Sequence, residues 1–215
     1  MNTDALIAKL SADLVAVHGG AARASLLKAL GVGASISCLF VLLGPSLGLR
    51  PDLGSALQTG LFWVKVCYTA SIAVLGLLAL ERLSRPESDR VHWVRLLWPP
   101  MALLCTITAA RSTLSPAVSN TAFWFGSSWW ECPLYVLALS APVVVALIFA
   151  LSRLAPTRLA LAGAAAGLVG GATGATAYAL HCVETSPAFV LVWYSLGLAA
   201  TSATGALLGR RMLRW

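Results

Sequence analysis

Two cysteines stand out because each lies at the edge of a long apolar stretch with acidic residues nearby. Cys132, in "SSWWECPLYV", follows Glu131, and Cys182, in "YALHCVET", lies beside His181 and near Glu184. Thiolates bind soft metal ions, and paired thiols can form a disulfide in an oxidising compartment. The residue types therefore indicate redox chemistry or a soft-metal site at Cys132 and Cys182, with His181, Glu131 and Glu184 as candidate neighbouring donors.

The elements that hold these residues are predicted to be transmembrane helices. Of the 215 residues, 59% are hydrophobic and 11% are charged, which does not fit one soluble domain. A membrane-spanning helix needs about 20 apolar residues. Six stretches meet this criterion: Ala29–Leu49, Leu61–Leu80, His92–Ala110, Pro133–Leu151, Leu159–His181 and Phe189–Leu208. We predict an all-α integral membrane bundle of six transmembrane helices.

The orientation follows from the basic residues. If the N-terminus, the second and fourth connections and the C-terminus share one side, that side holds 12 of the 15 lysines and arginines. Basic residues in short loops stay in the cytoplasm. We therefore expect both termini inside, and we explain the net charge of +7 by topology and anionic lipid, with no direct nucleic-acid binding.

This topology places both cysteines at the outer face. The fourth span begins at that face near Cys132, and the fifth returns to it near Cys182. The short inner connection at 153–158 makes the two spans antiparallel neighbours, so their outer ends should meet. Cys38, Cys67 and Cys105 lie inside spans and are interpreted as small apolar residues.

Small residues predict close helix packing in the last two spans. Gly163, Gly167 and Gly171 are four apart, as are Gly205 and Gly209. Such spacing lets helix backbones approach in lipid, within one chain or between copies, so a homo-oligomer stays open. In the third span, Pro99 and Pro100 are expected to bend or loosen the helix.

Residues 1–28 form a separate N-terminal segment before the transmembrane domain at 29–215. Leu6, Ile7, Leu10 and Leu14 recur at helical spacing, with Asp13 mostly off their face. Thr3 could cap this helix, and "HGG" at 18–20 would end it. The apolar face could dock into a partner, lie on the membrane or pack against the inner loops.

Two further features allow more than one interpretation. Lys65, near the outer end of the second span, is expected to extend to the lipid headgroups or to pair with an acid such as Glu131. The outer segment containing Phe123, Trp124, Phe125, Trp129 and Trp130 is interpreted as an aromatic belt rather than a ligand pocket.

Several motifs together resemble the NrsF-like family of bacterial membrane anti-sigma factors. They are "LIAKLSADLVAV", "LGLRPDL", "WWECPL", "LHCVETSPAFVLVWYSLG" and the terminal "GRRMLRW". The resemblance covers nearly the whole chain and implies six spans in the bacterial inner membrane. It implies an extracytoplasmic-function sigma factor as partner, bound through the cytoplasmic tail and loops and released under oxidative or heavy-metal stress. Cys132 and Cys182 match the family's outer sensing cysteines, whereas Ala16 replaces the family's proline.

The sigma-binding residues that we predict from the tail pattern and this resemblance are Leu6, Ile7, Leu10, Asp13 and Leu14. Two alternatives from other classes remain. A membrane thiol-disulfide oxidoreductase would usually carry a Cys-x-x-Cys pair, and this chain has none. A small-solute transporter would want ionisable residues near mid-membrane, and the spans are nearly free of them. We see no catalytic constellation and no resident cofactor beyond a soft metal ion at the cysteines, so we do not expect an enzyme.

Overall fold

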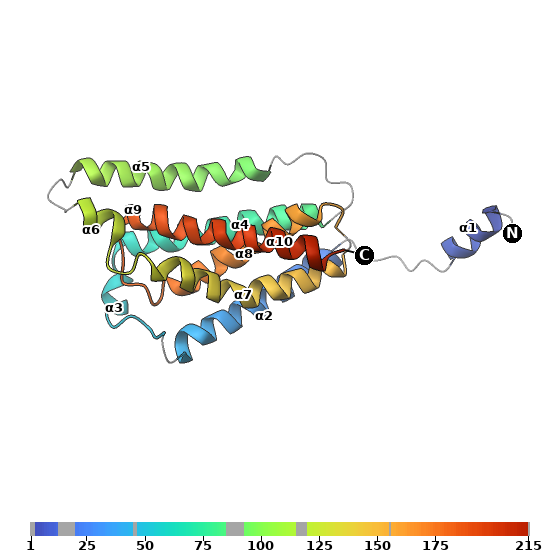
Figure 1. Cartoon of the computed structure of the whole chain (residues 1–215), viewed down its shortest axis with the longest axis horizontal. Coiled ribbons are helices and arrows are strands. Elements are labelled where there is room, and N and C mark those ends of the chain that lie inside the picture. Colours follow the sequence, from blue (N-terminus) through green and yellow to red (C-terminus); the bar gives the residue numbers. More distant parts are fainter. Residues whose placement is uncertain are drawn as a thin grey trace.

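The computed structural model describes residues 3–12, 20–44, 47–84, 93–114, 120–154 and 156–214, and within these ranges every regular element is helical (Figure 1). The longer helices are α1 (Thr3–Ala12), α2 (Ala21–Leu43), α4 (Gly60–Leu83), α5 (Trp98–Leu114), α7 (Glu131–Ser152), α8 (Leu159–Tyr178) and α10 (Ser195–Met212). The shorter ones are α3 (Leu53–Ala56), α6 (Asn120–Phe125), α9 (Pro187–Phe189), the 3-10 helix η1 (Trp93–Leu97) and the π-helix η2 (Val190–Tyr194). The all-α prediction is confirmed.

Five helical segments of the described chain are long and apolar enough to cross a membrane. They are Ala21–Leu43, Gly60–Leu83, Glu131–Ser152, Leu159–Tyr178 and Pro187–Met212, the last comprising α9, η2 and α10. At 1.5 Å per residue, each is about 30 Å or more in length, which matches a hydrocarbon core. These helices indicate a membrane protein with five candidate spans, and the third predicted span, His92–Ala110, is not among them.

The unconfirmed third span, predicted at His92–Ala110, corresponds to η1 and α5. The α-helical part has 17 residues, because Trp93–Leu97 is wound as a 3-10 helix. Pro99 and Pro100 lie in the first turn of α5, where a missing backbone N–H costs no helical hydrogen bond. The expected distortion is thus a junction between two helix types rather than a bend inside one. Figure 1 shows α5 lying along the bundle.

The first span differs from its predicted bounds of Ala29–Leu49. Helix α2 begins at Ala21, because "AARASLLK" at 21–28 is rich in good helix formers and continues into the apolar stretch. It ends at Leu43, and Gly44 is extended, with its N–H donating to the Phe40 carbonyl. Residues 21–28 therefore belong to the span, and the chain leaves the helix six residues earlier than expected.

Helix α8 forms the centre of the bundle and packs against α4, α7 and α10. A Cβ placed on Gly163 would lie 2.8 Å from the Cα of Gly209, and one on Gly167 would lie 2.9 Å from the Cα of Ser202. Ser202 also donates a hydrogen bond of 3.1 Å to the Ala164 carbonyl. Close packing through small residues is therefore confirmed, and it occurs between α8 and α10 of one chain.

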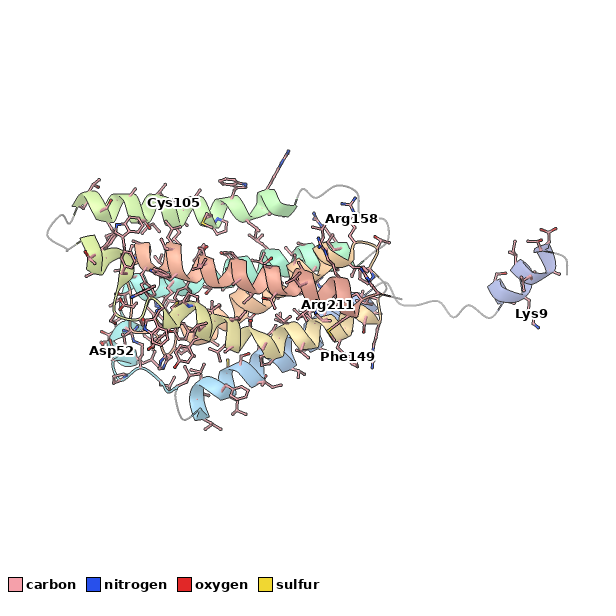
Figure 2. The ribbon with its side chains drawn as sticks, in the orientation of Figure 1. Lys9, Asp52, Cys105, Phe149, Arg158 and Arg211 are labelled. Carbon is pink, nitrogen blue, oxygen red and sulfur yellow. The ribbon has the colours of Figure 1, made fainter. Side chains whose placement is uncertain are left out.

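The bundle has two chemically different ends. The arginine end contains Arg82 of α4, Arg153 and Arg158 of the α7–α8 connection, and Arg210 and Arg211 of α10. The cysteine end contains residues 47–59, 126–132 and 179–187. Figure 2 shows Arg158 and Arg211 at the opposite end of the bundle from Asp52. The antiparallel helices thus connect a basic surface to the cysteine region.

Candidate functional site

The two cysteines predicted to act together lie in one buried cluster at the cysteine end. Cys132 is in the first turn of α7 and is 0% exposed, and Cys182 lies in the connection after α8 and is 3% exposed. Both are free cysteines, and the cluster also contains Tyr178 and Tyr194. Each thiol is an electrostatic neighbour of the other and of Lys65. The structure therefore brings the cysteine pair into one environment.

Lys65 of α4 lies inside the bundle, so the expectation that it extends to lipid headgroups is wrong. Its side chain is 1% exposed, and its ammonium donates to the backbone carbonyls of Cys182 and Glu184 at 2.9 and 2.8 Å. The expected pairing with Glu131 is replaced by these carbonyl contacts and by the Tyr194 ring, whose centroid is 5.7 Å from Nζ. Lys65 thus holds the Cys182 connection against α4.

A second cation, Arg50, links the α2–α3 connection to the backbone of the α8–α9 connection. Its guanidinium donates to the carbonyls of Cys182 at 3.2 Å and Val183 at 3.4 Å, and it forms two 2.7 Å hydrogen bonds with the carboxylate of Asp52. The hydrogen bonds with Asp52 raise the pKa of Arg50 and lower the pKa of Asp52. The Arg50 N–H also donates to the Leu180 carbonyl at 3.1 Å. We call residues 47–52 the Arg50 strap.

His181 and Glu184, both named as candidate donors, have other partners. His181 Nδ1 lies 2.8 Å from the Gly48 carbonyl and 3.3 Å from the Gly48 nitrogen, so its ring contacts the Arg50 strap. The Glu184 carboxylate accepts 2.7 and 2.8 Å hydrogen bonds from the N–H and hydroxyl of Ser127. Within the described residues, no group of three or more His, Cys, Asp and Glu side chains is arranged to hold a metal ion. The soft-metal hypothesis therefore depends on the two thiols.

The turn at Gly126, which contacts the Glu184 carboxylate, requires glycine. Gly126 has a φ of +59°, a left-handed conformation that other residues rarely adopt. A Cβ at this position would lie 2.7 Å from the Glu184 carboxyl carbon. A further hydrogen bond joins the same two segments, since Ser186 of the α8–α9 connection donates to the Phe123 carbonyl at 2.6 Å. Glu184 therefore joins the α8–α9 connection to the segment that leads into Cys132.

An open cavity of about 370 Å³ leads into the cysteine end between the Arg50 strap and the start of α7. Residues of several elements line it: Leu47, Gly48, Leu49, Arg50, Pro51, Ser128, Glu131, Tyr178, His181, Cys182 and Val183. Glu131 thus faces the same cavity as His181 and Cys182. Among the described residues that line it, Cys182 is the only thiol.

Tyr194 completes the cluster from the last span. It belongs to η2, and π-turns of this kind are rare and often occur at functional sites. Its hydroxyl is buried next to the Cys182 side chain, a weak sulfur acceptor, and makes no well-aligned hydrogen bond among the described residues. The neighbouring Ser195 hydroxyl lies 2.7 Å from that of Tyr68. A buried hydroxyl that is satisfied this poorly calls for an explanation.

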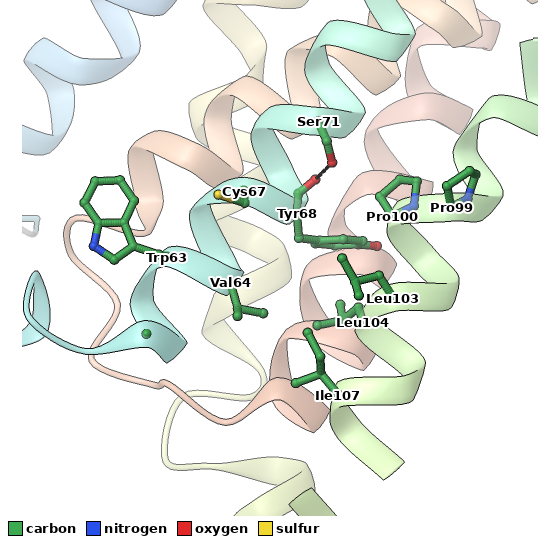
Figure 3. Close-up of a pocket in the computed structure, with 11 residues that line it drawn as sticks. Trp63, Val64, Cys67, Tyr68, Ser71, Pro99, Pro100, Leu103, Leu104 and Ile107 are labelled. Carbon is green, nitrogen blue, oxygen red and sulfur yellow. Dashed lines mark hydrogen bonds between the residues drawn. The ribbon is translucent and has the colours of Figure 1, made fainter. Parts of the chain in front are cut away.

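A second cavity, of about 510 Å³, lies between α4 and α5 (Figure 3). Apolar residues such as Val64, Leu103, Leu104 and Ile107 dominate its lining, together with Pro99. Figure 3 shows the Tyr68 ring between the two helices. Among the described residues that line it, none is acidic or basic.

The predicted sigma-binding residues are described only in part. Leu6 and Ile7 of α1 have exposed side chains, at 40% and 59%. Nothing is described for the Leu10 side chain, and Asp13 and Leu14 lie outside the described residues. Figure 1 shows α1 apart from the bundle.

The aromatic segment is consistent with a membrane-interface belt. Trp129 packs 5.2 Å from the Trp193 ring centroid, and the Trp193 indole donates to the Trp124 carbonyl at 2.9 Å. Trp124, Phe125, Trp129 and Trp130 are all substantially exposed. Rings at the end of apolar helices suit the boundary between lipid and water.

Comparison with known proteins identifies the family. A family model described as "Negative regulator of sigma F", NrsF, matches residues 10–215. The chain belongs to the NrsF family. It is 40% identical over 216 residues to the probable anti-sigma-F factor NrsF of Azospira oryzae and 38% identical over 218 residues to the anti-sigma-F factor NrsF of Caulobacter vibrioides, with 100% of each chain covered. No solved structure matches it.

In this NrsF-family chain, sequence analysis missed Arg50, Asp52, Tyr178 and Tyr194 as members of the cysteine site. Arg50 and Asp52 stand two apart in "LGLRPDL", so their opposite charges were a visible signal for a local ion pair. The two tyrosines gave no comparable signal, because an aromatic residue in an apolar span usually belongs to the core.

Proposed function

We propose that the chain is a membrane anti-sigma factor that binds an extracytoplasmic-function sigma factor at the bacterial inner membrane and releases it under thiol stress. The observation that carries the proposal is full-length similarity to two proteins named as anti-sigma-F factors. The five apolar helices support the membrane location. The cysteine pair supports a signal of oxidising or thiophilic-metal stress.

In this proposal the arginine end faces the cytoplasm. Arg82, Arg153, Arg158, Arg210 and Arg211 lie together at that end, as the positive-inside rule requires. The cysteine end then faces the oxidising side, where thiol pairs can be oxidised. The tail and both termini would meet the sigma factor on the cytoplasmic side.

The sigma-binding surface is proposed to include α1. Leu6 and Ile7 are exposed apolar side chains, and an amphipathic helix of this type can dock into a groove of a partner. Together with Leu10, Asp13 and Leu14, they would form the contact surface. The basic residues of the arginine end would add contacts to acidic residues of the sigma factor.

Signal transfer would use the helices that connect the two ends. Cys132 is on α7, and Lys65 links the Cys182 backbone to α4, which reaches the arginine end at Arg82. A disulfide, or a metal ion held by both thiols, would change how these helices are held together. The change releases the sigma factor only if it favours the sigma-free arrangement over the sigma-bound one.

Co-purification tests the proposal most simply. The chain is extracted from native membranes in detergent, and bound proteins are identified by mass spectrometry, with a chain lacking residues 3–12 as control. We expect a sigma factor bound to the full chain and less of it bound to the control. Bound quinone and a thiol substrate in place of a sigma factor would contradict the proposal and favour an oxidoreductase.

A further inference from the structure

We infer that the two cysteines have unequal roles: Cys182 reacts first with an oxygen-donating oxidant that enters through the 370 Å³ cavity, and Cys132 is the resolving thiol. This inference rests on the proposed function, because it assigns an order to the thiol chemistry that would release the sigma factor. It makes the cavity at the cysteine end the entry site for the inducing molecule.

Access separates the two thiols. Cys182 lines the open cavity, whereas Cys132 is 0% exposed and packs in the buried cluster in the first turn of α7. The lining also includes the polar residues Glu131, His181 and Ser128. A small polar oxidant in this cavity therefore meets Cys182, which is 3% exposed, whereas Cys132 is not among the residues that line the cavity.

The surroundings of Cys182 also fit a reactive thiol. Lys65 and Arg50 both donate to its backbone carbonyl, which fixes the residue at the cavity and places two cations next to it. Reactive cysteines occur in partly accessible, electropositive surroundings of this kind. The other ionisable groups of the site are Asp52, Glu131, Tyr178, His181, Glu184 and Tyr194.

The Tyr194 hydroxyl gains a role in this scheme. It is fully buried next to the Cys182 side chain, whose sulfur is a weak acceptor, and it has no well-aligned hydrogen bond among the described residues. A sulfenic acid at Cys182 carries an oxygen atom that could accept a hydrogen bond from this hydroxyl. Oxidation of Cys182 would thus replace a weak sulfur acceptor with a stronger oxygen acceptor.

The chemistry balances with a hydroperoxide as oxidant. The Cys182 sulfur attacks one peroxide oxygen, the O–O bond breaks, and water or an alcohol leaves, which gives the sulfenic acid. The Cys132 sulfur then attacks the Cys182 sulfur, the S–O bond breaks, and water leaves with the Cys132 proton. Two thiols lose two electrons and two protons in total, and the peroxide is reduced.

The first test uses the unmodified cysteine pair. The full chain in detergent is treated with limiting iodoacetamide, which alkylates a thiol with loss of iodide, and modified peptides are quantified by mass spectrometry. We expect Cys182 to be alkylated at least tenfold faster than Cys132. Equal rates, or faster alkylation of Cys132, would overturn the inference without any substitution.

The second test separates the thiols in a chain that lacks the other cysteines through Cys38→Ala, Cys67→Ala and Cys105→Ala. Hydrogen peroxide is added with dimedone, which traps sulfenic acids. With Cys132→Ser we expect a dimedone adduct at Cys182, and with Cys182→Ser we expect at least tenfold less adduct at Cys132. Comparable trapping at both positions would contradict the assigned order.

The third test examines the route. Leu49 and Leu57 are exposed leucines of the α2–α4 connection, at 48% and 43%, but only Leu49 lines the cavity. We expect Leu49→Trp to slow Cys182 trapping several-fold and Leu57→Trp to leave it unchanged. Equal trapping in both variants would mean that the oxidant does not enter through this cavity.

These outcomes are distinct from failure of the proposed function. If no thiol reacts with peroxide at all, oxidant sensing itself is refuted. If both thiols react but Cys132 reacts first, only the assigned order is refuted. If the order holds and no sigma factor is bound, the thiol chemistry stands and the anti-sigma proposal fails.

Discussion

The cysteine end and the arginine end use basic residues in opposite ways. At the cysteine end, Arg50 is 5% exposed and forms two 2.7 Å hydrogen bonds with Asp52, while Lys65 is 1% exposed. At the arginine end, Arg210 and Arg211 are exposed, and Arg23 lies 3.9 Å from Glu81 with 65% of its side chain accessible. One end uses basic residues as buried hydrogen-bond donors, whereas the other presents them as surface charge.

The difference shows that the role of a basic residue here depends on the contacts of its side chain rather than on how many basic residues lie at that end. Exposed ion pairs contribute little to stability. Removing one partner of a buried hydrogen bond costs much more stability, because the remaining donor or acceptor is left unsatisfied. Surface arginines at one end suit topology and partner binding. Buried cations at the other end fix the position of Cys182. The following predictions test this contrast and the packing between the two ends.

The largest effect is expected where the helices that connect the ends are closest. Gly167→Leu on α8 would force atoms into the space occupied by α10, because a Cβ at this position would lie only 2.9 Å from the Cα of Ser202. We expect about 1–3 kcal/mol of destabilisation, or failure to fold. Gly31→Leu on α2 is the control, because nothing lies within 4 Å of a Cβ placed there. Equal melting temperatures for the two variants would contradict the packing account.

A smaller but substantial effect is expected in the tail. Leu10→Glu combined with Leu14→Glu would place charge on the proposed docking face, and loss of a central apolar contact typically costs about 2 kcal/mol or more of binding. We expect at least a tenfold weaker complex with the sigma factor and unchanged membrane insertion. Ser11→Glu is the control, since the exposed Ser11 hydroxyl only donates to the Ala8 carbonyl. Unchanged binding in the double variant would exclude the tail from the interface.

The third prediction compares the two ends directly. Arg50→Met removes charged donors from the carbonyls of Cys182 and Val183, so we expect faster amide hydrogen exchange in residues 180–184 and at residue 50. A charged hydrogen bond contributes about 1.5–3 kcal/mol, which corresponds to at least tenfold faster local exchange. Arg23→Met removes an exposed cation at the other end and should change exchange little. Similar exchange in both variants would remove the distinction between the ends.

The smallest effect concerns pH. Because its hydrogen bonds with Arg50 lower the pKa of Asp52, this carboxylate stabilises the fold at pH values above its ordinary pKa of about 3.9. That contribution is lost as the pH falls through the lowered pKa. We expect the difference in melting temperature between the unmodified chain and Asp52→Asn to be present at pH 7 and to shrink toward pH 3. A difference that stays constant over this range would contradict the ion-pair assignment.

The sequence predicts the parts of the fold that depend on composition and helical spacing. Long apolar stretches give the helices, and the small residues at Gly163, Gly167 and Gly205 give the α8–α10 contact, because both signals are local. Helix limits were less predictable. Residues 21–28 extend α2, because helix propensity carries the helix beyond the apolar stretch.

The cysteine site was predictable only in part. The position of Cys132 and Cys182 at one end follows from span lengths. The partners of Lys65 do not, because its acceptors are backbone carbonyls more than 100 positions away in the chain, and any residue type could supply them. The same holds for the contact of Arg50 with the Cys182 carbonyl. The contact of Glu184 with the turn at Gly126 was also missed, because it joins two connections that lie far apart in the sequence.

The most direct test of the account measures sigma-factor release from a purified complex. The complex is immobilised through the membrane chain, treated with peroxide and washed, and the bound sigma factor is quantified; the chain is then reduced, sigma factor is added back, and binding is quantified again. We predict release from the unmodified chain, rebinding after a dithiol reductant, and full retention in Cys132→Ser and Cys182→Ser chains. Retention of the sigma factor by the unmodified chain with its disulfide formed, or release from either serine variant as large as that from the unmodified chain, would contradict the account.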